Sequence, residues 1–552
     1  MSEKPSHLIP LAGGCLAALL LLLWLVRREN VPGPEAPPTA AGALPVMPLP
    51  PAAEPPPTAA ASVGQPAAPA LAVLRALRDL PRATGARAHE AILTFTSAEA
   101  YQRFLARAAR LGLTILGRLD GLLTVRVRYD SLAALENDVL ANPGDYADAG
   151  ANFFISIPPV PPKQDRAAQN LVPLGNNTLA FLGVTGDRSQ WGSGVTIAVL
   201  DSGVAPDATF GSGRVQYLDI GLGTAPGTGT DDGHGTAVAA LAAGQAPDAP
   251  GVAPDASILS IRITDASGQS DIFTVAQAIV AAVDAGVPII NISFGGYATT
   301  GVLTQAIDYA TQNGTVIVAS AGNDQAAQLT WPAADPRVVS VGAVDALEQQ
   351  VYFSNAGPEL KLTAPGYGVQ TAWLDGQRVY FDGTSASAPI AAGAIAALMS
   401  TTPGLSATQA AQVLEQYASD GGAPGPDPDY GDGIVNLGWA MNRNNALYVD
   451  TALAGQYYDT ATGQMEFVVQ NRSGQGVGGM VLSVDAGGTT TTYSIPLLGP
   501  GASYVVAVPV DQAKLQAGQG LIFQTQLTNP AGLIDQVPAN NRKTSALAPP
   551  TP

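Results

Sequence analysis

Three polar residues in this sequence could together activate a hydroxyl nucleophile. His234 lies in DDGHGTAVAALAAG, residues 231–244, and is the last of the chain's three histidines. A serine hydroxyl is a poor nucleophile at neutral pH unless a base takes its proton, and histidine has a suitable pKa. Ser385 lies in GTSASAP, and Asp201 follows VTIAVL. We therefore predict that Ser385 attacks, His234 is the base, and Asp201 orients the imidazole and stabilises its charged form.

Two further groups could stabilise an oxyanion produced by that attack. Ser385 opens a run of small residues that reads as a helix, so backbone N–H groups and the helix dipole would favour negative charge there. Asn323 in SAGND could supply a side-chain donor. Taken singly, Asp201 and Ser385 would be ordinary caps and Asn323 a turn residue. Their joint occurrence with His234 favours the catalytic interpretation.

The elements that must position these residues are five apolar runs separated by helical segments. The runs are VTIAVL, SILSIRI, PIINISF, TVIVASAG and VVSVGAV, between residues 195 and 344. Strands this apolar are covered on both faces, which indicates an α/β domain with a doubly wound, mostly parallel sheet, here assigned to 175–443. Sites form at the carboxyl ends of such strands, where Asp201, Ser293 and Asn323 lie.

From about 185 to 442 the sequence resembles the subtilisin-like serine proteases. VTIAVLDSGV, DDGHGTAVA and FDGTSASAPIAAG are similar to the family's aspartate, histidine and serine segments, and SAGND to its oxyanion-asparagine motif. The resemblance implies a serine endopeptidase with an acyl-enzyme intermediate, in which Asp201, His234 and Ser385 form the triad and Asn323 binds the oxyanion. GTSAS alone would also fit the sedolisins, which use a glutamate base, but DDGHGT disfavours them.

The family's substrate-binding strand is matched by NISFGG. This match implies that Ser293, Phe294, Gly295 and Gly296 bind the substrate backbone. The rival interpretation of the whole chain is an inactive relative that serves as a surface binding module.

The N-terminal region predicts a membrane anchor or signal segment over residues 1–30. Residues 8–26 form an uncharged run of nearly the ~20 residues that a spanning helix needs, and no small-residue cleavage site follows promptly. An uncleaved anchor is therefore favoured over a cleaved signal peptide, and a lipoprotein box at LAGGC is a third alternative. Residues 31–80 are interpreted as a Pro/Ala-rich extended linker. The enzyme is expected in the cell envelope, anchored with its catalytic domain outside the plasma membrane, or secreted after processing.

Residues 81–162 predict a small α+β domain. Strands are expected over 91–97, 122–129 and 152–157, with helices after Ser97 and over 131–141. This order resembles the ferredoxin-like propeptide of subtilisins, which implies an autoprocessed zymogen cut by Ser385 between about 153 and 175. The chain's own propeptide would then be a partner of the groove. The alternative is a permanent accessory domain without an inhibitory role.

Residues 446–546 predict an all-β sandwich. MEFVVQN, GMVLSVD, TTYSIPL, SYVVAVPV and LIFQTQLT alternate apolar with polar residues and are separated by Gly, Pro and Asn turns. IDQVPANNRKT resembles the end of CARDB-type modules. A stability or spacer role is favoured over ligand binding.

Composition limits the partners and cofactors. A net charge of −18 and a pI near 4.4 argue against nucleic acid, so the partners expected are protein or peptide substrates and, through residues 8–26, a membrane. Catalysis requires no cofactor. A structural calcium is left open and unplaced, because the segment after the histidine helix lacks the family's asparagine-rich loop. Asp427, Asp429 and Asp432 could hold a cation, although solvated turn carboxylates are the favoured interpretation.

Overall fold

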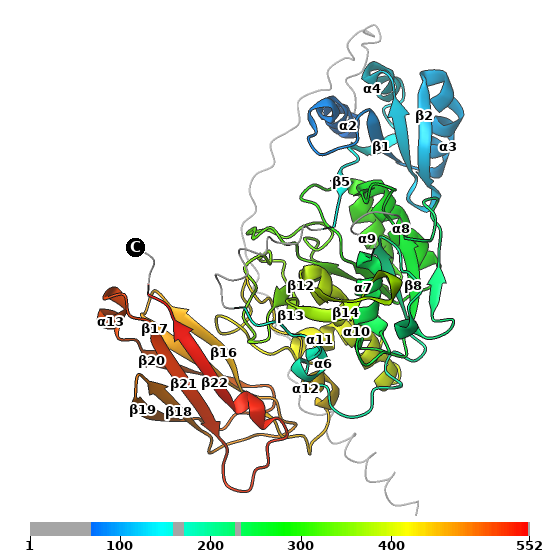
Figure 1. Ribbon diagram of the computed structural model, residues 1–552. Coiled ribbons are helices and arrows are strands. Elements are labelled where there is room, and N and C mark those ends of the chain that lie inside the picture. The colour runs from blue at the N-terminus through cyan, green and yellow to red at the C-terminus, as the bar shows by residue number, and fades with distance from the viewer. Residues whose placement is uncertain (1–67, 158–170, 227–232, 550–552) are drawn as a thin grey trace, which may run out of the picture. The chain divides into compact units, whose positions relative to one another are not determined.

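A seven-stranded parallel sheet forms the centre of the catalytic region (Figure 1). The computed structural model describes residues 68–157, 171–226 and 233–549. The strand order is β13-β12-β11-β10-β6-β8-β7, and every neighbouring pair is parallel. The strands are β6 (Thr196–Asp201), β7 (Val215–Tyr217), β8 (Ser257–Arg262), β10 (Ile289–Ile292), β11 (Val316–Ser320), β12 (Val339–Val344) and β13 (Leu362–Pro365). All five predicted strands are confirmed, and the short strands β7 and β13 extend the two edges.

Helices cover both faces of this sheet, as the continuously apolar strands predict. Ile197 and Val199 of β6 pack in one core with α7 (His234–Ala243), α10 (Thr384–Thr401) and α11 (Ala407–Gln416). Ala198 and Leu200 point to the opposite core, with α8 (Ile272–Asp284) and α9 (Gly301–Gln312). The fold is therefore the predicted doubly wound α/β arrangement. The remaining short elements of this region are α6 (Thr178–Phe181), β9 (Ser270–Asp271), β14 (Val369–Ala372), β15 (Arg378–Phe381) and α12 (Leu437–Asn442).

The small residues of α7 and α10 allow the two site-bearing helices to approach closely. Every residue of α7 is buried, and alanine is the commonest residue in both helices. A Cβ on Gly393 of α10 would lie 2.8 Å from the Ala242 carbonyl oxygen. A larger side chain at this contact would force the helices apart, and with them the residues at their N-termini.

The α+β domain has the βαββαβ order of ferredoxin-like folds. Its elements are β1 (Glu90–Phe95), α3 (Ala98–Arg107), β2 (Leu113–Leu119), β3 (Thr124–Tyr129), α4 (Leu132–Ala141) and β4 (Tyr146–Gly150), and the antiparallel sheet has the order β2-β3-β1-β4. Two strands differ from prediction. LTILGRL forms β2, and the last sheet strand is Tyr146–Gly150, because the apolar segment that follows pairs outside this sheet as β5 (Phe154–Ile155).

Helix α2 (Ala68–Asp79) corrects the expected extent of the linker. The range 31–80 was assigned to an extended tether, but its last part is helical. Ala70, Val73, Leu74 and Leu77 follow the i, i+3, i+4, i+7 spacing of an amphipathic helix and are buried in the α+β core. The proline content of the preceding residues obscured this spacing. The expected anchor at 8–26 and the earlier part of the linker lie outside the described residues.

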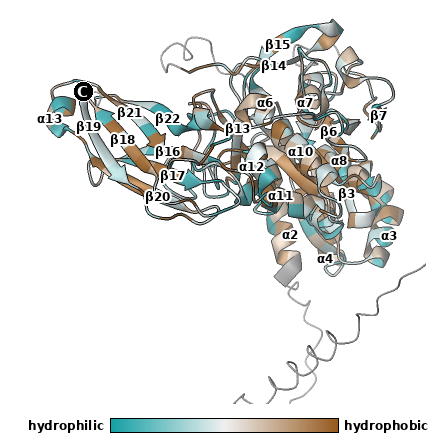
Figure 2. Ribbon diagram, turned by 90° about the horizontal axis from the view of Figure 1, so that it is seen from below, coloured by the Kyte–Doolittle hydropathy of each residue, from teal (hydrophilic) through white to brown (hydrophobic). Residues whose placement is uncertain are grey.

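The C-terminal region is a β-sandwich, as predicted. One sheet has the order β16-β17-β20 and the other β19-β18-β21-β22. The elements are β16 (Thr451–Asp459), β17 (Gln464–Asn471), β18 (Val481–Ala486), β19 (Thr489–Ser494), β20 (Ser503–Pro509), α13 (Gln512–Gln516), β21 (Leu521–Thr528) and β22 (Arg542–Leu547). Burial alternates along β18, β20 and β21, and the inward-facing set of the sandwich, including Phe467, Leu482 and Phe523, forms the core. Figure 2 shows hydrophobic and hydrophilic segments next to one another in this region.

Among the helices in the described ranges, none combines the length and the apolar character that crossing a bilayer requires.

Replacing Leu77 by Ala should destabilise the α+β domain by about 3 kcal/mol, because it leaves a cavity in a closed core. Leu77 is 0% exposed, whereas Leu71 on the same helix is 50% exposed. Hydrogen exchange of β4 amides in the full chain measures the effect. The Leu71→Ala variant is the matched control and should exchange like the wild type; equal acceleration in both variants would contradict the packing of α2.

Candidate active site

Asp201 and His234 meet at the carboxyl end of the central sheet. Strand β6 ends at Asp201, and α7 begins at His234. Asp201 is fully buried, and its Oδ1 accepts hydrogen bonds from His234 Nδ1 at 2.8 Å and from the Ser202 backbone N–H at 2.7 Å. This contact keeps a proton on Nδ1 and leaves Nε2 as the basic nitrogen. Within the described ranges, Nε2 has no hydrogen-bond partner.

Aromatic rings enclose the His234 imidazole. Phe294 and Phe381 contact it edge-on, with ring centroids 6.0 Å and 5.3 Å away. Histidine is thereby held in a mostly apolar surrounding, with 4% of its surface exposed. Phe381 was not predicted as a site residue, and its place directly before DGTS is the one sequence signal that could have indicated it.

The two glycines beside His234 lie in close contact with neighbouring segments. A Cβ on Gly233 would lie 2.2 Å from the Trp373 indole, and a Cβ on Gly235 would lie 2.4 Å from the Gly203 carbonyl oxygen and 3.1 Å from Asp201 Oδ1. The glycines therefore let the start of α7 approach the end of β6 and the Trp373 ring.

Ser385 is the second residue of α10 and is 3% exposed. Its Oγ donates to the Ser293 carbonyl oxygen at 3.4 Å, a long hydrogen bond. The Ser385–His234 hydrogen bond is not formed in this structure. Catalytic hydrogen bonds are often long or unformed without substrate and tighten when substrate binds, so the geometry is compatible with transfer of the serine proton to Nε2.

Two N–H donors border one small space beside Ser385. Asn323 Oδ1 accepts from the backbone N–H and from the hydroxyl of Thr384, both at 2.9 Å, and this directs the amide nitrogen away from Thr384. A Cβ on Gly383, whose φ is +125°, would lie 2.8 Å from Asn323 Nδ2 and 3.6 Å from the Ser385 nitrogen. Both donors can therefore reach an oxyanion beside Gly383. Thr384 was missed from the sequence because a threonine at a helix start is common.

A hydrogen-bonded tyrosine stabilises the loop that carries Asn323. Tyr297 Oη donates to Asp324 at 2.6 Å and accepts from Asn355 Nδ2 at 3.0 Å. Burial, reinforced by the Asp324 carboxylate, raises the pKa of Tyr297 to about 12. The phenol consequently stays protonated at neutral pH and continues to donate to Asp324.

The four residues predicted to bind substrate have separate contacts. Ser293 exchanges hydrogen bonds with Ser385, its own Oγ donating to the Ser385 carbonyl at 3.2 Å. Phe294 packs against His234, and Gly296 pairs with Trp331. Gly295 alone of the four pairs with the α+β domain's C-terminal segment: its N–H donates to the Ser156 carbonyl at 3.1 Å, and its carbonyl accepts from the Ser156 N–H at 3.4 Å.

That segment lies in a slot between two edges of the catalytic domain. Phe154 and Ile155 pair antiparallel with Asp271 and Ser270 of β9, while Ser156 pairs with Gly295 on the other side. Ile155 is 1% exposed and joins the core of α8 and α9. An extended peptide can therefore bind here by main-chain hydrogen bonds on both sides, close to Ser385.

The acidic turn at 427–432 is held by hydrogen bonds of its own. Asp427 Oδ1 accepts from the backbone N–H groups of Asp429 and Tyr430, both at 2.8 Å. Across residues 68–157, 171–226 and 233–549, no group of three or more His, Cys, Asp or Glu side chains is arranged to hold a metal ion. These hydrogen bonds within the turn are therefore sufficient to explain the conformation of the Asp427 side chain.

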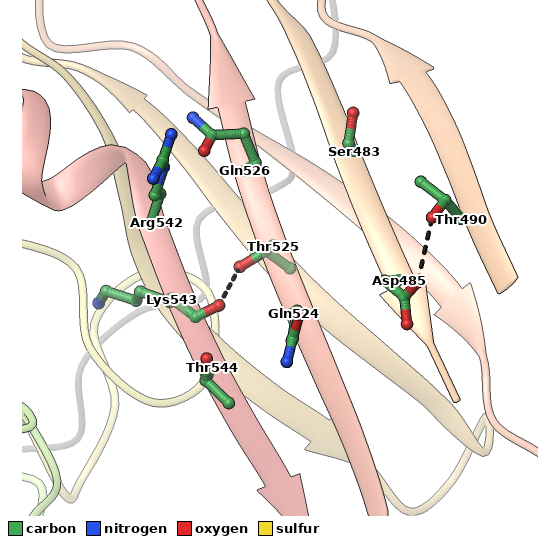
Figure 3. A pocket seen from close by; sticks show the side chains of 9 residues that line it. All are labelled: Ser483, Asp485, Thr490, Gln524, Thr525, Gln526, Arg542, Lys543 and Thr544. Atoms are coloured by element: carbon green, nitrogen blue, oxygen red, sulfur yellow. Dashed lines mark hydrogen bonds between the residues drawn. The ribbon is translucent and has the colours of Figure 1, made fainter. Parts of the chain in front are cut away.

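A hollow of about 620 Å³ lies away from Ser385, on the outer face of the sandwich sheet that contains β18, β21 and β22 (Figure 3). Its lining residues are polar: Ser483, Asp485, Thr490, Gln524, Thr525, Gln526, Arg542, Lys543 and Thr544. None of them is a histidine, and the hydroxyls of Thr490 and Thr525 are bonded to Asp485 and to the Lys543 carbonyl. The hollow has no activated nucleophile.

Comparisons with known proteins show which family this chain resembles in sequence. A family model described as "Subtilase family" matches residues 192–433. The thermostable alkaline protease of Halalkalibacterium halodurans is 33% identical over 258 residues, covering 46% of this chain and 69% of that protein. Subtilisin Savinase of Lederbergia lenta is 32% identical over 254 residues, covering 45% of this chain and 91% of that protein. Among solved structures, the protease domain of PatA is 29% identical, with a TM-score of 0.44, and covers 47% of this chain and 97% of that domain.

A fluorophosphonate probe should label Ser385, because the predicted base His234 and the two N–H donors beside Gly383 would activate its hydroxyl. Replacing His234 by Ala should slow labelling about 100-fold or more. Mass spectrometry of tryptic peptides measures both results. Ser387→Ala is the matched control, since this buried serine hydroxyl bonds to the Ala364 carbonyl, away from His234. Labelling at another residue, or equal labelling of the His234→Ala variant, would contradict the assignment.

Proposed function

This chain belongs to the subtilase family and is a serine endopeptidase, and from that premise we propose that Asp201, His234 and Ser385 are its catalytic triad. Its substrates are proteins or peptides. The observation that carries the proposal is the 2.8 Å contact of His234 Nδ1 with the buried Asp201, at the sheet edge where α10 begins with Thr384 and Ser385. An inactive relative would have no need to retain all three groups beside an oxyanion pocket.

The proposed reaction begins when Ser385 Oγ attacks the scissile carbonyl and His234 Nε2 takes the hydroxyl proton. The negative charge on the carbonyl oxygen is stabilised by Asn323 Nδ2 and the Ser385 N–H. Collapse of this intermediate breaks the C–N bond, and His234 gives its proton to the leaving amine, which yields the acyl-enzyme. Water then attacks the ester, His234 takes a proton from it, and the proton returns to Ser385 as the acid is released. Asp201 accepts the hydrogen bond from Nδ1 and stabilises the imidazolium. No cofactor enters these steps.

Replacing His234 by Ala should lower casein hydrolysis at least 100-fold, because Ser385 loses its base. The variant should lose thermal stability, since the buried Asp201 loses its imidazole partner, but it should still fold, because the Ser202 N–H remains bonded to Asp201. His89→Ala is the control and should cut casein like the wild type. Casein hydrolysis at the wild-type rate by the His234→Ala protein would refute the triad.

We also propose that the α+β domain is a propeptide and that the enzyme is made as a zymogen. The support is that residues 154–156 occupy the slot beside Ser385, with main-chain hydrogen bonds on both sides, which excludes a substrate from the same position. A permanent accessory domain would also fit the fold. Because residues 154–156 occupy the slot, we expect them to inhibit peptide cleavage by the catalytic domain.

The proposed location is outside the plasma membrane, either tethered through residues 8–26 or released by processing. The apolar run at 8–26 and the proline-rich residues after it support a tether. Cleavage after the α+β domain would separate the catalytic domain from that tether.

Wild-type protein should show a new N-terminus between about 153 and 175, whereas the Ser385→Ala protein should stay full length. N-terminal sequencing of both proteins, expressed alike, measures this, and Ser387→Ala should be processed like the wild type. Equal cleavage of wild type and Ser385→Ala would mean that another protease cuts the chain. If the uncut wild-type protein is fully active, the α+β domain is not a propeptide.

A further inference from the structure

Two carboxylates of the catalytic domain, Asp265 and Asp271, lie where β9 borders the slot, and arginines of the α+β domain neutralise them. Arg87 Nε contacts Asp271 Oδ2 at 2.6 Å, and its terminal nitrogen lies 3.5 Å from Asp265 Oδ2. Arg126 approaches Asp271 at 3.3 Å, although its main partner is Glu90 at 2.8 Å. The pairing crosses from one domain to the other, so it exists only while the α+β domain is bound.

The catalytic domain supplies no replacement for these arginines within the described ranges. Arg262, which contacts the Asp265 backbone, donates to the carbonyl oxygens of Thr264, Asp265 and Ala225, and no ion pair joins it to either carboxylate. Asp271 retains one contact of its own domain: it caps α8 by accepting from the Thr274 N–H at 2.9 Å. Loss of the α+β domain therefore exposes two uncompensated acids.

Asp265 remains charged at neutral pH. Burial disfavours its ionised form, but hydrogen bonds from Ser267 and Gln269 outweigh burial and lower the pKa of its carboxyl. Asp271 caps a helix N-terminus, where negative charge is favourable.

The position of Phe154 shows which residue of a bound peptide would reach these acids. Along the slot, Ile155 points into the catalytic domain, whereas Phe154 is 37% exposed on the outer side. The Arg87 guanidinium lies over the Phe154 ring, 4.8 Å from its centroid. A long cationic side chain at the Phe154 position would therefore extend toward the place that Arg87 occupies.

We infer that Asp271 and Asp265 form an acidic subsite, which selects peptide substrates carrying Arg or Lys two residues before the residue that pairs with Gly295. The inference rests on the proposed function, because it requires substrates to take the slot that residues 154–156 occupy. In the intact chain, Arg87 fills the subsite from the α+β domain. In a substrate, the cation comes from the peptide itself.

The test is cleavage of a proteome-derived peptide library by purified, processed protein. Wild type should enrich Arg and Lys at one fixed position upstream of the cut, about five-fold over their background frequency, as expected for a partly exposed ion pair. Enrichment should be lost in Asp271→Asn, since Asn keeps the α8 cap but removes the charge. It should also weaken in 1 M NaCl, which screens exposed charges.

A matched pair of peptides, differing only by Arg or Gln at the enriched position, gives the kinetic form of the test. The ratio of their kcat/KM values should be about five for wild type and about one for Asp271→Asn. Asp308→Asn on α9, an exposed carboxylate outside the slot, is the control and should keep the wild-type ratio. If Asp271→Asn fails to fold, Asp265→Asn should show a reduced ratio.

The outcomes separate this inference from the proposed function. No cleavage of any library peptide by wild type would overturn the proposed function itself. Efficient cleavage without upstream Arg or Lys enrichment, or enrichment unchanged in both Asn variants, would overturn only the acidic subsite.

Discussion

The hydrogen bond between Asp201 and His234 is the contact on which the rest of the site depends. It joins the end of β6 to the start of α7, and it is short because Gly235 lets backbone and carboxylate approach where a Cβ would collide. A buried carboxylate must be compensated, and here the imidazole and the Ser202 N–H supply the compensation. The same interaction therefore stabilises the buried charge and orients the base.

Close packing of small residues between α7 and α10 also positions Ser385. Helices α7 and α10 share one core on one face of the central sheet, and glycine and alanine at their contact hold their N-termini at the same edge. Thr384 then fixes the Asn323 side chain through two hydrogen bonds, so the proposed oxyanion donor is oriented before any substrate arrives. Such preorganisation avoids reorganisation cost during the reaction.

The slot beside Ser385 combines non-selective and selective binding. Main-chain hydrogen bonds to Gly295 and β9 are available to any extended peptide, whereas the core that receives Ile155 and the carboxylates of Asp265 and Asp271 discriminate between side chains. The α+β domain uses both kinds of contact at once. The α+β domain therefore binds the catalytic domain through both apolar and ionic contacts, and salt should weaken only the ionic contacts.

Local sequence patterns predicted the parallel sheet, the three successive fold types and the proposed site residues Asp201, His234, Ser385 and Asn323, because buried strands and strand-end polar residues leave such patterns. It did not reveal α2, whose apolar spacing is hidden beside prolines, or β4, which has little alternation. Tertiary structure alone decided that Phe381 and Trp373 enclose the start of α7, and that Arg87 meets an acid 184 residues away. These contacts join segments distant in sequence, and no local periodicity or propensity encodes which segments will meet.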